Sequence, residues 1–288
     1  MITIEEALKI ILEETKMLGL ESKDILSSLN YVIGEDIYSK DMLPFFDKSA
    51  MDGYAIRSED SENYTTLKVK GIIKAGDYCS EELKAGEALK IMTGAALPPG
   101  ADAVIEIEKV KIDGDNIVLA DFPSKWSNVI RKGEEISIGD LAIETGKVIR
   151  APEIGFLASL GYNNVQVYRK PTIAILITGD ELVDICEKFT AGKIRNSNEY
   201  SLNALIQNIG AKPLSLGIVP DDKSIIKEKM IYAFENADIV ISSGGASVGD
   251  YDFIEAALSG IGADIKFTEI SIKPGKPVTF ATYNNKLF

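Results

Sequence analysis

Residues 237–253, with the sequence ADIVISSGGASVGDYDF, restrict the possible folds of this chain more than any other segment. Residues 239–241 are apolar and β-branched, which is typical of a strand buried on both faces. Residues 243–247 are small and allow backbone N–H groups to approach an anion closely, and residues 254–258 have helical spacing. A strand, a glycine turn and a helix in this order predict a phosphate-binding unit, although a purely structural turn has the same pattern.

Two carboxylates, Asp250 and Asp252, follow this turn. They would repel a bound phosphate unless a divalent cation lay between the charges. The segment therefore predicts a site for an anion together with a metal ion.

The composition excludes several functions. The chain of 288 residues has a formal net charge of −13, which disfavours a nucleic-acid surface because such surfaces need clustered Lys and Arg. It contains no histidine, so Ser-His-Asp and Cys-His chemistry is excluded. Carboxylates, lysines, hydroxyls and a metal ion remain as possible catalytic groups.

Cys79 and Cys186 are too few for a disulfide framework or a cysteine metal site. No membrane span and no signal peptide is recognisable, so we expect a cytoplasmic protein that does not bind membranes.

The first half of the chain predicts a helix followed by a small antiparallel β domain. Thr3 and Glu6 have the spacing of a capping box, and residues 67–120 alternate apolar with charged residues between Gly and Asp turns. In residues 47–57, DKSAMDGYAIR, one interpretation makes Met51, Tyr54 and Ile56 core residues and Asp52-Gly53 a turn. A functional loop is the other. Residues 154–160 predict a further helix, which ends at Gly161.

From Thr172 onward, apolar runs alternate with amphipathic segments, which predicts a doubly wound α/β domain. The expected strands are residues 173–177, 213–218 and 239–241, and the expected helices are residues 200–209 and 224–234. A strand-like segment precedes Phe288, and an α/β domain that ends there is expected to be incomplete.

Acidic residues follow each of the three expected strands: Asp180 and Glu181 after the first, Asp221 and Asp222 after the second, and Asp250 and Asp252 after the third. Ligands of such sheets bind at the carboxyl ends of the strands, so we expect these residues to converge on one edge. Each acid taken singly is explained by solvation, but their recurrence beside a glycine turn favours a site. Lys273 and Lys276 lie in a tight turn that is expected to add cations at this edge, unless it is simply a hairpin with solvated lysines.

Six motifs together carry a resemblance to a known family. DKSAMDGYAIR, KIMTGAALPPGADAVI, APEIGFLASLG, ITGDEL, SSGGASVGDYDF and IKPGKP occur in the order found in molybdopterin molybdenumtransferases, the family that includes the catalytic domain of gephyrin. The α/β domain alone is shared with molybdopterin adenylyltransferases and competence-damage-inducible proteins. The MDGYA and MTGA stretches point to the transferase. Lys48 stands where the family commonly has asparagine, and the family continues beyond Phe288, so the chain resembles a truncated member whose activity is open.

The resemblance implies that adenylylated molybdopterin and molybdate react, with the assistance of Mg²⁺, to give molybdenum cofactor and AMP. The implied catalytic residues are Asp52, Thr93, Glu181, Asp221 or its neighbour Asp222, and Asp252. The implied metal ligands are Glu181, Asp250 and Asp252. The residues implied to hold the pterin or the phosphate are Ser243, Gly244, Gly245 and Ser247, with Lys273 and Lys276 facing the anions.

The family pattern also implies the domain organisation. Residues 1–45 and 143–170 form an elongated linking domain, residues 46–142 an inserted β domain, and residues 171–288 a molybdopterin-binding α/β domain that is incomplete. The implied assembly is a homodimer in which small-domain loops of one subunit serve the glycine loop of its mate. Three alternatives remain: a homologue that uses tungstate, an enzyme acting on another nucleotide pyrophosphate, and a scaffold that shares the α/β domain.

Overall fold

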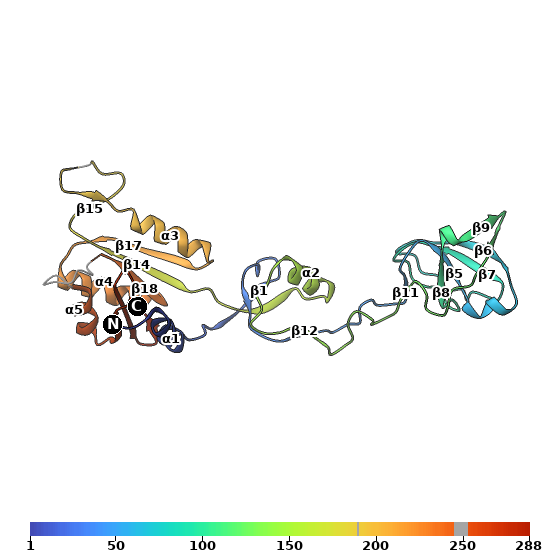
Figure 1. Cartoon of the computed structure of the whole chain (residues 1–288), viewed down its shortest axis with the longest axis horizontal. Helices are drawn as coiled ribbons and strands as arrows, with labels where there is room; N and C mark the ends of the chain where they lie inside the picture. Colours follow the sequence, from blue (N-terminus) through green and yellow to red (C-terminus); the bar gives the residue numbers. More distant parts are fainter. Residues whose placement is uncertain (189, 245–252) are drawn as a thin grey trace. The chain divides into compact units, whose positions relative to one another are not determined.

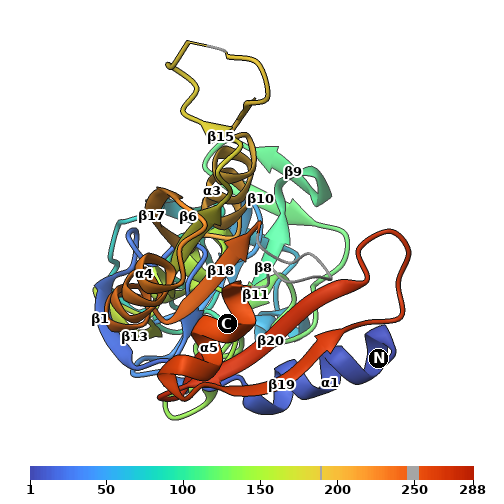
Figure 2. The same cartoon turned by 90° about the vertical axis from the view of Figure 1, so that its left-hand side faces the viewer.

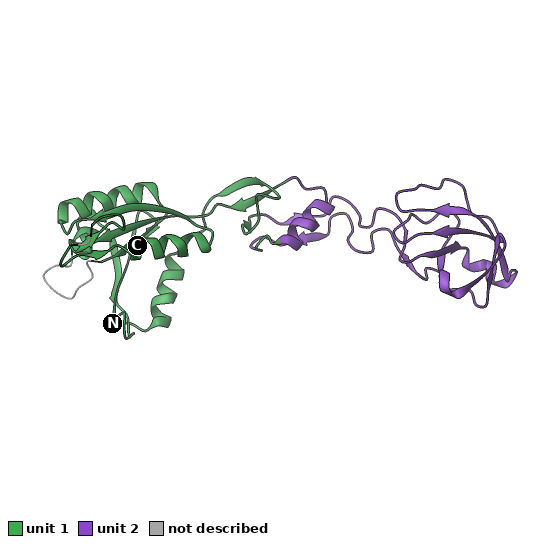
Figure 3. Ribbon diagram, turned by 90° about the horizontal axis from the view of Figure 1, so that it is seen from above, with its two compact units in different colours: residues 1–34, 148–150, 164–288 green, residues 35–147, 151–163 purple. Residues whose placement is uncertain are grey.

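We describe a computed structural model of the chain, in which residues 1–188, 190–244 and 253–288 are placed well enough for description. The chain divides into two compact units, coloured separately in Figure 3. Unit 1 consists of residues 1–34, 148–150 and 164–288, and unit 2 consists of residues 35–147 and 151–163. The domain boundaries expected from the sequence stay a prediction.

Unit 1 is built on a six-stranded mixed sheet (Figure 1). Strand β14 lies between β17 and β18 and is parallel to both, whereas β20 is antiparallel to β19 and β21. In sheet order the strands are β17 (Lys212–Val219), β14 (Thr172–Thr178), β18 (Ile239–Ser243), β21 (Lys286–Leu287), β20 (Pro277–Tyr283) and β19 (Asp264–Glu269). These bounds confirm the three strands that the sequence predicted.

Helices cover both faces of this sheet, so the predicted doubly wound arrangement is confirmed (Figure 1). Helix α3 (Asn198–Asn208) packs on the face that carries Ile173, Ile175 and Ile177. Helices α4 (Lys223–Asn236) and α5 (Phe253–Ile261) pack on the opposite face.

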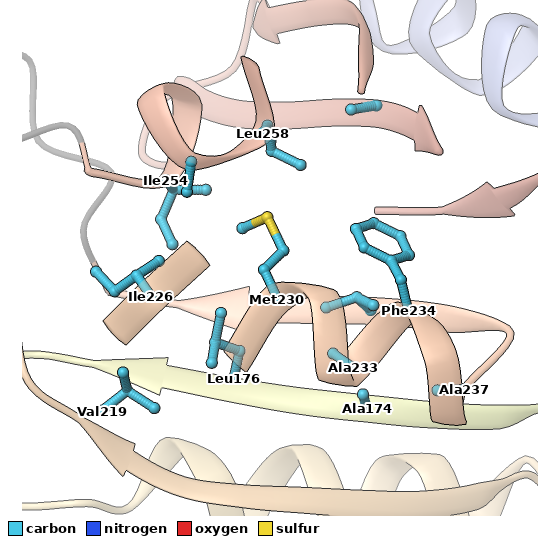
Figure 4. Packing of buried hydrophobic residues seen from close by; sticks show 13 residues of the cluster. Ala174, Leu176, Val219, Ile226, Met230, Ala233, Phe234, Ala237, Ile254 and Leu258 are labelled. Atoms are coloured by element: carbon cyan, nitrogen blue, oxygen red, sulfur yellow. The ribbon is translucent and has the colours of Figure 1, made fainter. Parts of the chain in front are cut away.

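Figure 4 shows Met230 and Phe234 of α4 among the side chains of the cluster on this second face, together with Leu176 of β14. Almost every residue of β14 is buried, because successive side chains enter two different cores. Each fully buried Leu, Ile or Met contributes about 1.5–3 kcal/mol, and this rigid sheet fixes where the loops at its edge begin.

Helix α1 (Ile4–Glu14) begins at the predicted capping box. The Thr3 hydroxyl accepts a hydrogen bond from the Glu6 N–H at 3.1 Å, and the Glu6 carboxylate accepts one from the Thr3 N–H at 2.8 Å. The inner face of the helix packs against Phe267 of β19 and Phe280 of β20, and Figure 2 shows the helix beside these strands.

The rest of unit 1 consists of a small sheet and a short strand pair. The sheet has three antiparallel strands, in the order β1 (Leu20–Asp24), β13 (Asn164–Tyr168) and β2 (Val32–Ile33). The pair is β15 (Leu182–Val183) and β16 (Ile194–Arg195), which run parallel. Arg169 follows β13 and makes two hydrogen bonds to Asp238, at 2.7 and 2.5 Å, which join this region to the start of β18.

Unit 2 contains a second six-stranded sheet. In sheet order its strands are β8 (Ala103–Glu106), β5 (Gly53–Ile56), β7 (Glu87–Ile91), β6 (Thr66–Ile73), β10 (Asn116–Leu119) and β9 (Val110–Asp113). The expectation of a purely antiparallel domain is wrong, because β6 and β7 are parallel. Residues 74–86 carry the chain back along the sheet between them, and such a return connection is what a parallel pair requires.

The DKSAMDGYAIR segment supplies the strand β5, in which Tyr54 and Ile56 are buried in the core. Gly53 opens this strand rather than completing a turn, which corrects the turn interpretation. A Cβ atom at Gly53 would lie 2.0 Å from the carbonyl oxygen of Ile105 on the neighbouring strand β8. Glycine is therefore required there by close backbone packing.

The remaining elements of unit 2 are short. Strand β3 (Ile37–Tyr38) pairs with β12 (Leu141–Ile143), and β4 (Lys48–Ser49) pairs with β11 (Val129–Ile130). Two 3₁₀ helices span Ser58–Glu62 and Ile107–Lys109, and helix α2 spans Ala151–Ser159. Gly161 ends α2 with a positive φ of 74°, as the sequence predicted. Within the described part of the chain, none of the helices combines the length and apolar character that crossing a bilayer requires.

Candidate functional site

The carboxyl ends of β14, β17 and β18 lie at one edge of the sheet in unit 1. Thr178 pairs with Val219, and Ile177 pairs with Ser243, so the three strands end at nearly the same level. The residues that follow β14 and β17 contact each other. The Asp221 N–H donates to Asp180 Oδ1 at 3.2 Å, and the Asp180 N–H lies 3.4 Å from Asp221 Oδ2. The predicted convergence is confirmed for these two strands.

Asp221 and Asp222, which the sequence could not separate, have different surroundings. Asp222 is the N-cap of α4 and accepts hydrogen bonds from the Ser224 N–H at 2.8 Å and the Ile225 N–H at 3.0 Å. Its pKa is lowered, chiefly by the Ser224 hydroxyl and then by these N–H groups. In contrast, Asp221 Oδ1 is buried and has no hydrogen-bond partner among the described residues. Of the two, Asp221 is the one with a buried oxygen that no described residue satisfies.

Glu181 lies over the turn that follows β14. Its carboxylate is folded against Gly179, where a Cβ atom would meet Glu181 Oε2 at 2.6 Å. The side chain borders a cavity of about 130 Å³ that is lined by residues of four neighbouring segments. The polar residues among them include Thr178, Glu181, Arg195, Asn196, Ser197, Asn198 and Ser243.

The start of the glycine turn forms the other wall of this cavity. Asn198, at the first turn of α3, donates a hydrogen bond to Ser243 Oγ at 2.8 Å. Gly244 has a φ of 102°, and a Cβ atom there would lie 2.0 Å from the carbonyl oxygen of Thr178. Only glycine allows β14 and the turn to approach so closely. Gly245, Ser247, Asp250 and Asp252 lie outside the described residues.

A larger cavity, of about 390 Å³, lies beside the same edge. The end of β18, through Ser243 and Gly244, lines one side, and the start of β20 at Pro277 lines the other. The predicted lysine turn directly precedes Pro277 and therefore borders this edge. The Lys276 ammonium forms an ion pair with Glu269 at 2.8 Å, which lowers the pKa of that carboxyl group. Lys273 is exposed.

The carboxylates of the edge suit a cation only in part. In residues 1–188, 190–244 and 253–288, no group of three or more Asp, Glu or Cys side chains lies close enough to hold a metal ion. Of the three ligands that the resemblance implied, Glu181 is described and Asp250 and Asp252 are not. Asp221 Oδ1, which no described residue satisfies, is the kind of donor that Mg²⁺ takes in proteins, so this residue and Glu181 supply part of the ligand set that such an ion needs.

Asp52 and Thr93, the predicted site residues of unit 2, are directly bonded to each other. Asp52 Oδ1 accepts hydrogen bonds from the Thr93 N–H and from the Thr93 hydroxyl, both at 2.7 Å. These bonds lower the pKa of Asp52, the N–H contributing most, and the charge of Lys90 acts in the same direction. Both side chains are exposed, so this hydrogen-bonded pair is held in place and open to solvent.

Unit 2 also contains a basic, aromatic cavity that the sequence reasoning missed. It measures about 430 Å³, and its lining includes Trp126, Arg131 and Lys132 together with one acidic residue, Glu134. The Arg131 guanidinium lies 5.1 Å from the centre of the Trp126 ring, and Trp126 has a φ of 67°, which is rare for a bulky residue. The signal in the sequence was the single tryptophan, followed five residues later by a basic pair.

The fold and its edge define the class of this domain: a doubly wound α/β domain, a class whose ligands bind at the carboxyl ends of the strands. Comparison with family models adds the particular family. Residues 2–161 match the model described as the MoeA N-terminal region (domain I and II), and residues 174–287 match the one described as a probable molybdopterin binding domain. The chain belongs to the molybdopterin molybdenumtransferase family, enzymes of molybdenum cofactor biosynthesis.

Individual relatives agree with this assignment. The chain is 37% identical over 290 residues to the molybdopterin molybdenumtransferase of Haemophilus influenzae, covering all of this chain and 72% of the relative. It is also 37% identical to the Nostoc sp. enzyme, covering 91% of this chain and 62% of that one. The crystal structure of the molybdopterin biosynthesis moeA protein from Pyrococcus horikoshii OT3 superimposes with a TM-score of 0.86 at 32% identity, covering 100% of this chain and 73% of that one. The resemblance seen in the motifs is thereby confirmed.

Proposed function

We propose that the chain inserts molybdenum from molybdate into adenylylated molybdopterin, with release of AMP, and that it does so as a cytoplasmic homodimer with Mg²⁺. The observation that carries this proposal is the convergence of Asp180, Asp221 and the Ser243–Gly244 turn on one sheet edge. Phosphoryl groups need close backbone approach, and metal-assisted chemistry needs carboxylates beside it.

Each side chain of the edge has a role in this proposal. Gly244 lets the backbone approach a phosphate group, and Asn198 fixes the hydroxyl of Ser243 beside it. Lys273 offers a positive charge to the anionic substrates, and Lys276 does so once its pairing with Glu269 is released. Gly245 and Ser247 are proposed to extend the phosphate-binding turn.

Asp221 Oδ1, which no described residue satisfies, and the carboxylate of Glu181 would hold Mg²⁺, together with Asp250 and Asp252. When bound, the ion would offset the repulsion between the negative charges of these carboxylates and those of the phosphate oxygens. Asp222 supports the site indirectly, because it caps α4 and so fixes the segment that carries Asp221.

Asp52 and Thr93 are proposed to serve the substrate from unit 2. Their mutual hydrogen bonds hold the carboxylate in one orientation before any substrate arrives, and preorganised groups act most effectively on developing charge. Because the chemistry needs these groups close to the bound oxyanion, we propose that two subunits contribute to each site, with two-fold symmetry giving two equivalent sites.

The test is complementation between subunits. Asp52→Ala and Asp221→Ala homodimers are each expected to lose more than about a hundredfold in molybdate-dependent AMP release from adenylylated molybdopterin, whereas mixed dimers regain activity because one site stays intact. Asp121→Ala, at an exposed carboxylate of unit 2, is the matched control and should be active. No recovery in mixed dimers of folded variants would refute the shared site.

The same assay separates the alternative functions. Competition between molybdate and tungstate decides which oxyanion is used. AMP release that does not depend on either oxyanion would indicate a different nucleotide-pyrophosphate enzyme, and an absence of release would favour a scaffold.

A further inference from the structure

The carboxyl end of β14 carries a hydroxyl group that none of the proposed roles uses. Thr178 is the last residue of this strand and is 1% exposed. Its Oγ1 atom is buried and makes no hydrogen bond to any residue that the structure describes. Folded proteins satisfy nearly all buried hydroxyls, because an unpaired one destabilises the fold. The group therefore points to a partner outside the residues that the structure describes.

The surroundings of this hydroxyl show where such a partner would lie. Thr178 lines the cavity of about 130 Å³ together with Ser243 and Gly244 of the glycine turn. A Cβ atom on Gly244 would lie 3.0 Å from Thr178 Oγ1, so the bare backbone of Gly244 lies beside the hydroxyl. Drug-sized ligands occupy cavities of roughly 300–1,000 Å³, so this smaller space suits one group of a ligand rather than a whole nucleotide.

We infer that Thr178 is a substrate-contacting residue whose hydroxyl donates a hydrogen bond to a phosphate oxygen of the nucleotide bound at the glycine turn. The direction of the bond follows from chemistry, since an ionised phosphate oxygen can only accept. An acceptor that carries charge makes the bond strong. The inference rests on the proposed function, because it takes the adenylyl phosphate as the ligand, and it adds a specific contact to that site.

The matched variants are Thr178→Val, which keeps the shape of the side chain and removes the hydroxyl, and Thr178→Ser, which keeps the hydroxyl. The probe is AMP with Mg²⁺, titrated by calorimetry, and the second readout is the thermal midpoint of the unliganded protein.

Thr178→Val is expected to weaken AMP binding by about tenfold or more. Its unliganded thermal midpoint is expected to be unchanged or higher, because no internal hydrogen bond is lost. Thr178→Ser is expected to stay within about threefold of the native affinity, since the donor is retained. Thr172→Val, at the opposite end of β14, is the control and should leave binding unchanged.

Two results would overturn the inference alone: native affinity in Thr178→Val, or a clearly lower unliganded midpoint in that variant, which would show that the hydroxyl has a structural partner. If the native chain itself fails to bind AMP, the nucleotide site of the proposed function is refuted and the contact falls with it. Failure of the inference and failure of the proposed function are thus distinguishable.

Discussion

Asp52 in unit 2 and Asp221 at the strand edge of unit 1 differ in the hydrogen bonds that their carboxylate oxygens accept. Asp52 Oδ1 accepts two hydrogen bonds from Thr93 although it is exposed, whereas Asp221 Oδ1 is buried and has no partner within the described chain. Asp52 Oδ1 therefore has its hydrogen bonds within unit 2 before a ligand arrives. At the unit 1 edge, Asp221 Oδ1 can still accept a hydrogen bond or bind a cation. This is the pattern expected where a substrate or cation completes the bonding.

The glycines of the two regions differ in the same way. Gly94, beside Thr93, has a φ of 79°, and a Cβ atom added to it would meet no atom within 4 Å. Gly244 has a φ of 102°, and a Cβ atom there would lie 2.0 Å from a backbone oxygen. One turn lies in open space, and the other is packed against the end of a buried strand.

The largest expected effect comes from this pair of glycines. Gly244→Ala should lower the free energy of unfolding by about 3 kcal/mol or more and abolish nucleotide binding, because both the backbone conformation and the overlap with Thr178 are unfavourable. Gly94→Ala carries only the conformational cost, about 1–2 kcal/mol. Urea denaturation of both variants measures the difference. Equal losses would contradict the contrast between a packed and an open turn.

An intermediate effect is expected at Asp238, the partly buried carboxylate of unit 1. Arg169 is the main cause of its lowered pKa, and the Thr172 N–H also donates to it at 2.8 Å. Asp238→Asn should therefore lower the free energy of unfolding at neutral pH by about 1–2 kcal/mol, a range reduced for partial exposure.

The pH dependence supplies a second readout for Asp238. Its folded-state pKa lies below the unfolded value of about 3.9, so its stabilisation is complete above that pH and is lost as the pH falls through the folded-state pKa. The thermal midpoint of the native chain should thus fall on acidification below about pH 4, and less steeply in Asp238→Asn. The pKa of Asp52 is shifted in the same direction, but Asp52→Asn should change the slope less because that group is exposed. Parallel curves for the native chain and Asp238→Asn would contradict this ranking.

The smallest effects are expected to differ in sign. Asp221→Asn removes a charge whose oxygen is buried without a partner in the described chain, so the unliganded protein should be unchanged or up to about 1 kcal/mol more stable, while its affinity for Mg²⁺ falls. Asp52→Asn weakens two existing hydrogen bonds and should be slightly destabilising. Thermal midpoints without ligand, and Mg²⁺ titrations of both variants, give the comparison. A destabilised Asp221→Asn would show that the edge is already satisfied.

The sequence predicted the local structure of unit 1 well because each signal was local. Residues 173–177 and 239–241 are apolar runs that specify strands, although in the second only Val240 is fully buried, and Thr3 with Glu6 is sufficient to specify the start of a helix. The rule that ligands lie at the carboxyl ends of parallel strands then located the edge on which Asp180 and Asp221 meet. Six short motifs were enough to recognise the family.

Other features depended on partners that are distant in the sequence. The alternation in residues 66–73 and 87–91 predicts strands but does not say whether they run parallel, because the direction is set by the path of the connecting segment. Asp221 and Asp222 are equivalent in a sequence pattern. Only the tertiary structure makes one the cap of α4 and leaves the other with a buried oxygen that no described residue satisfies, because hydrogen bonding and burial depend on which backbone groups the fold brings within about 3 Å.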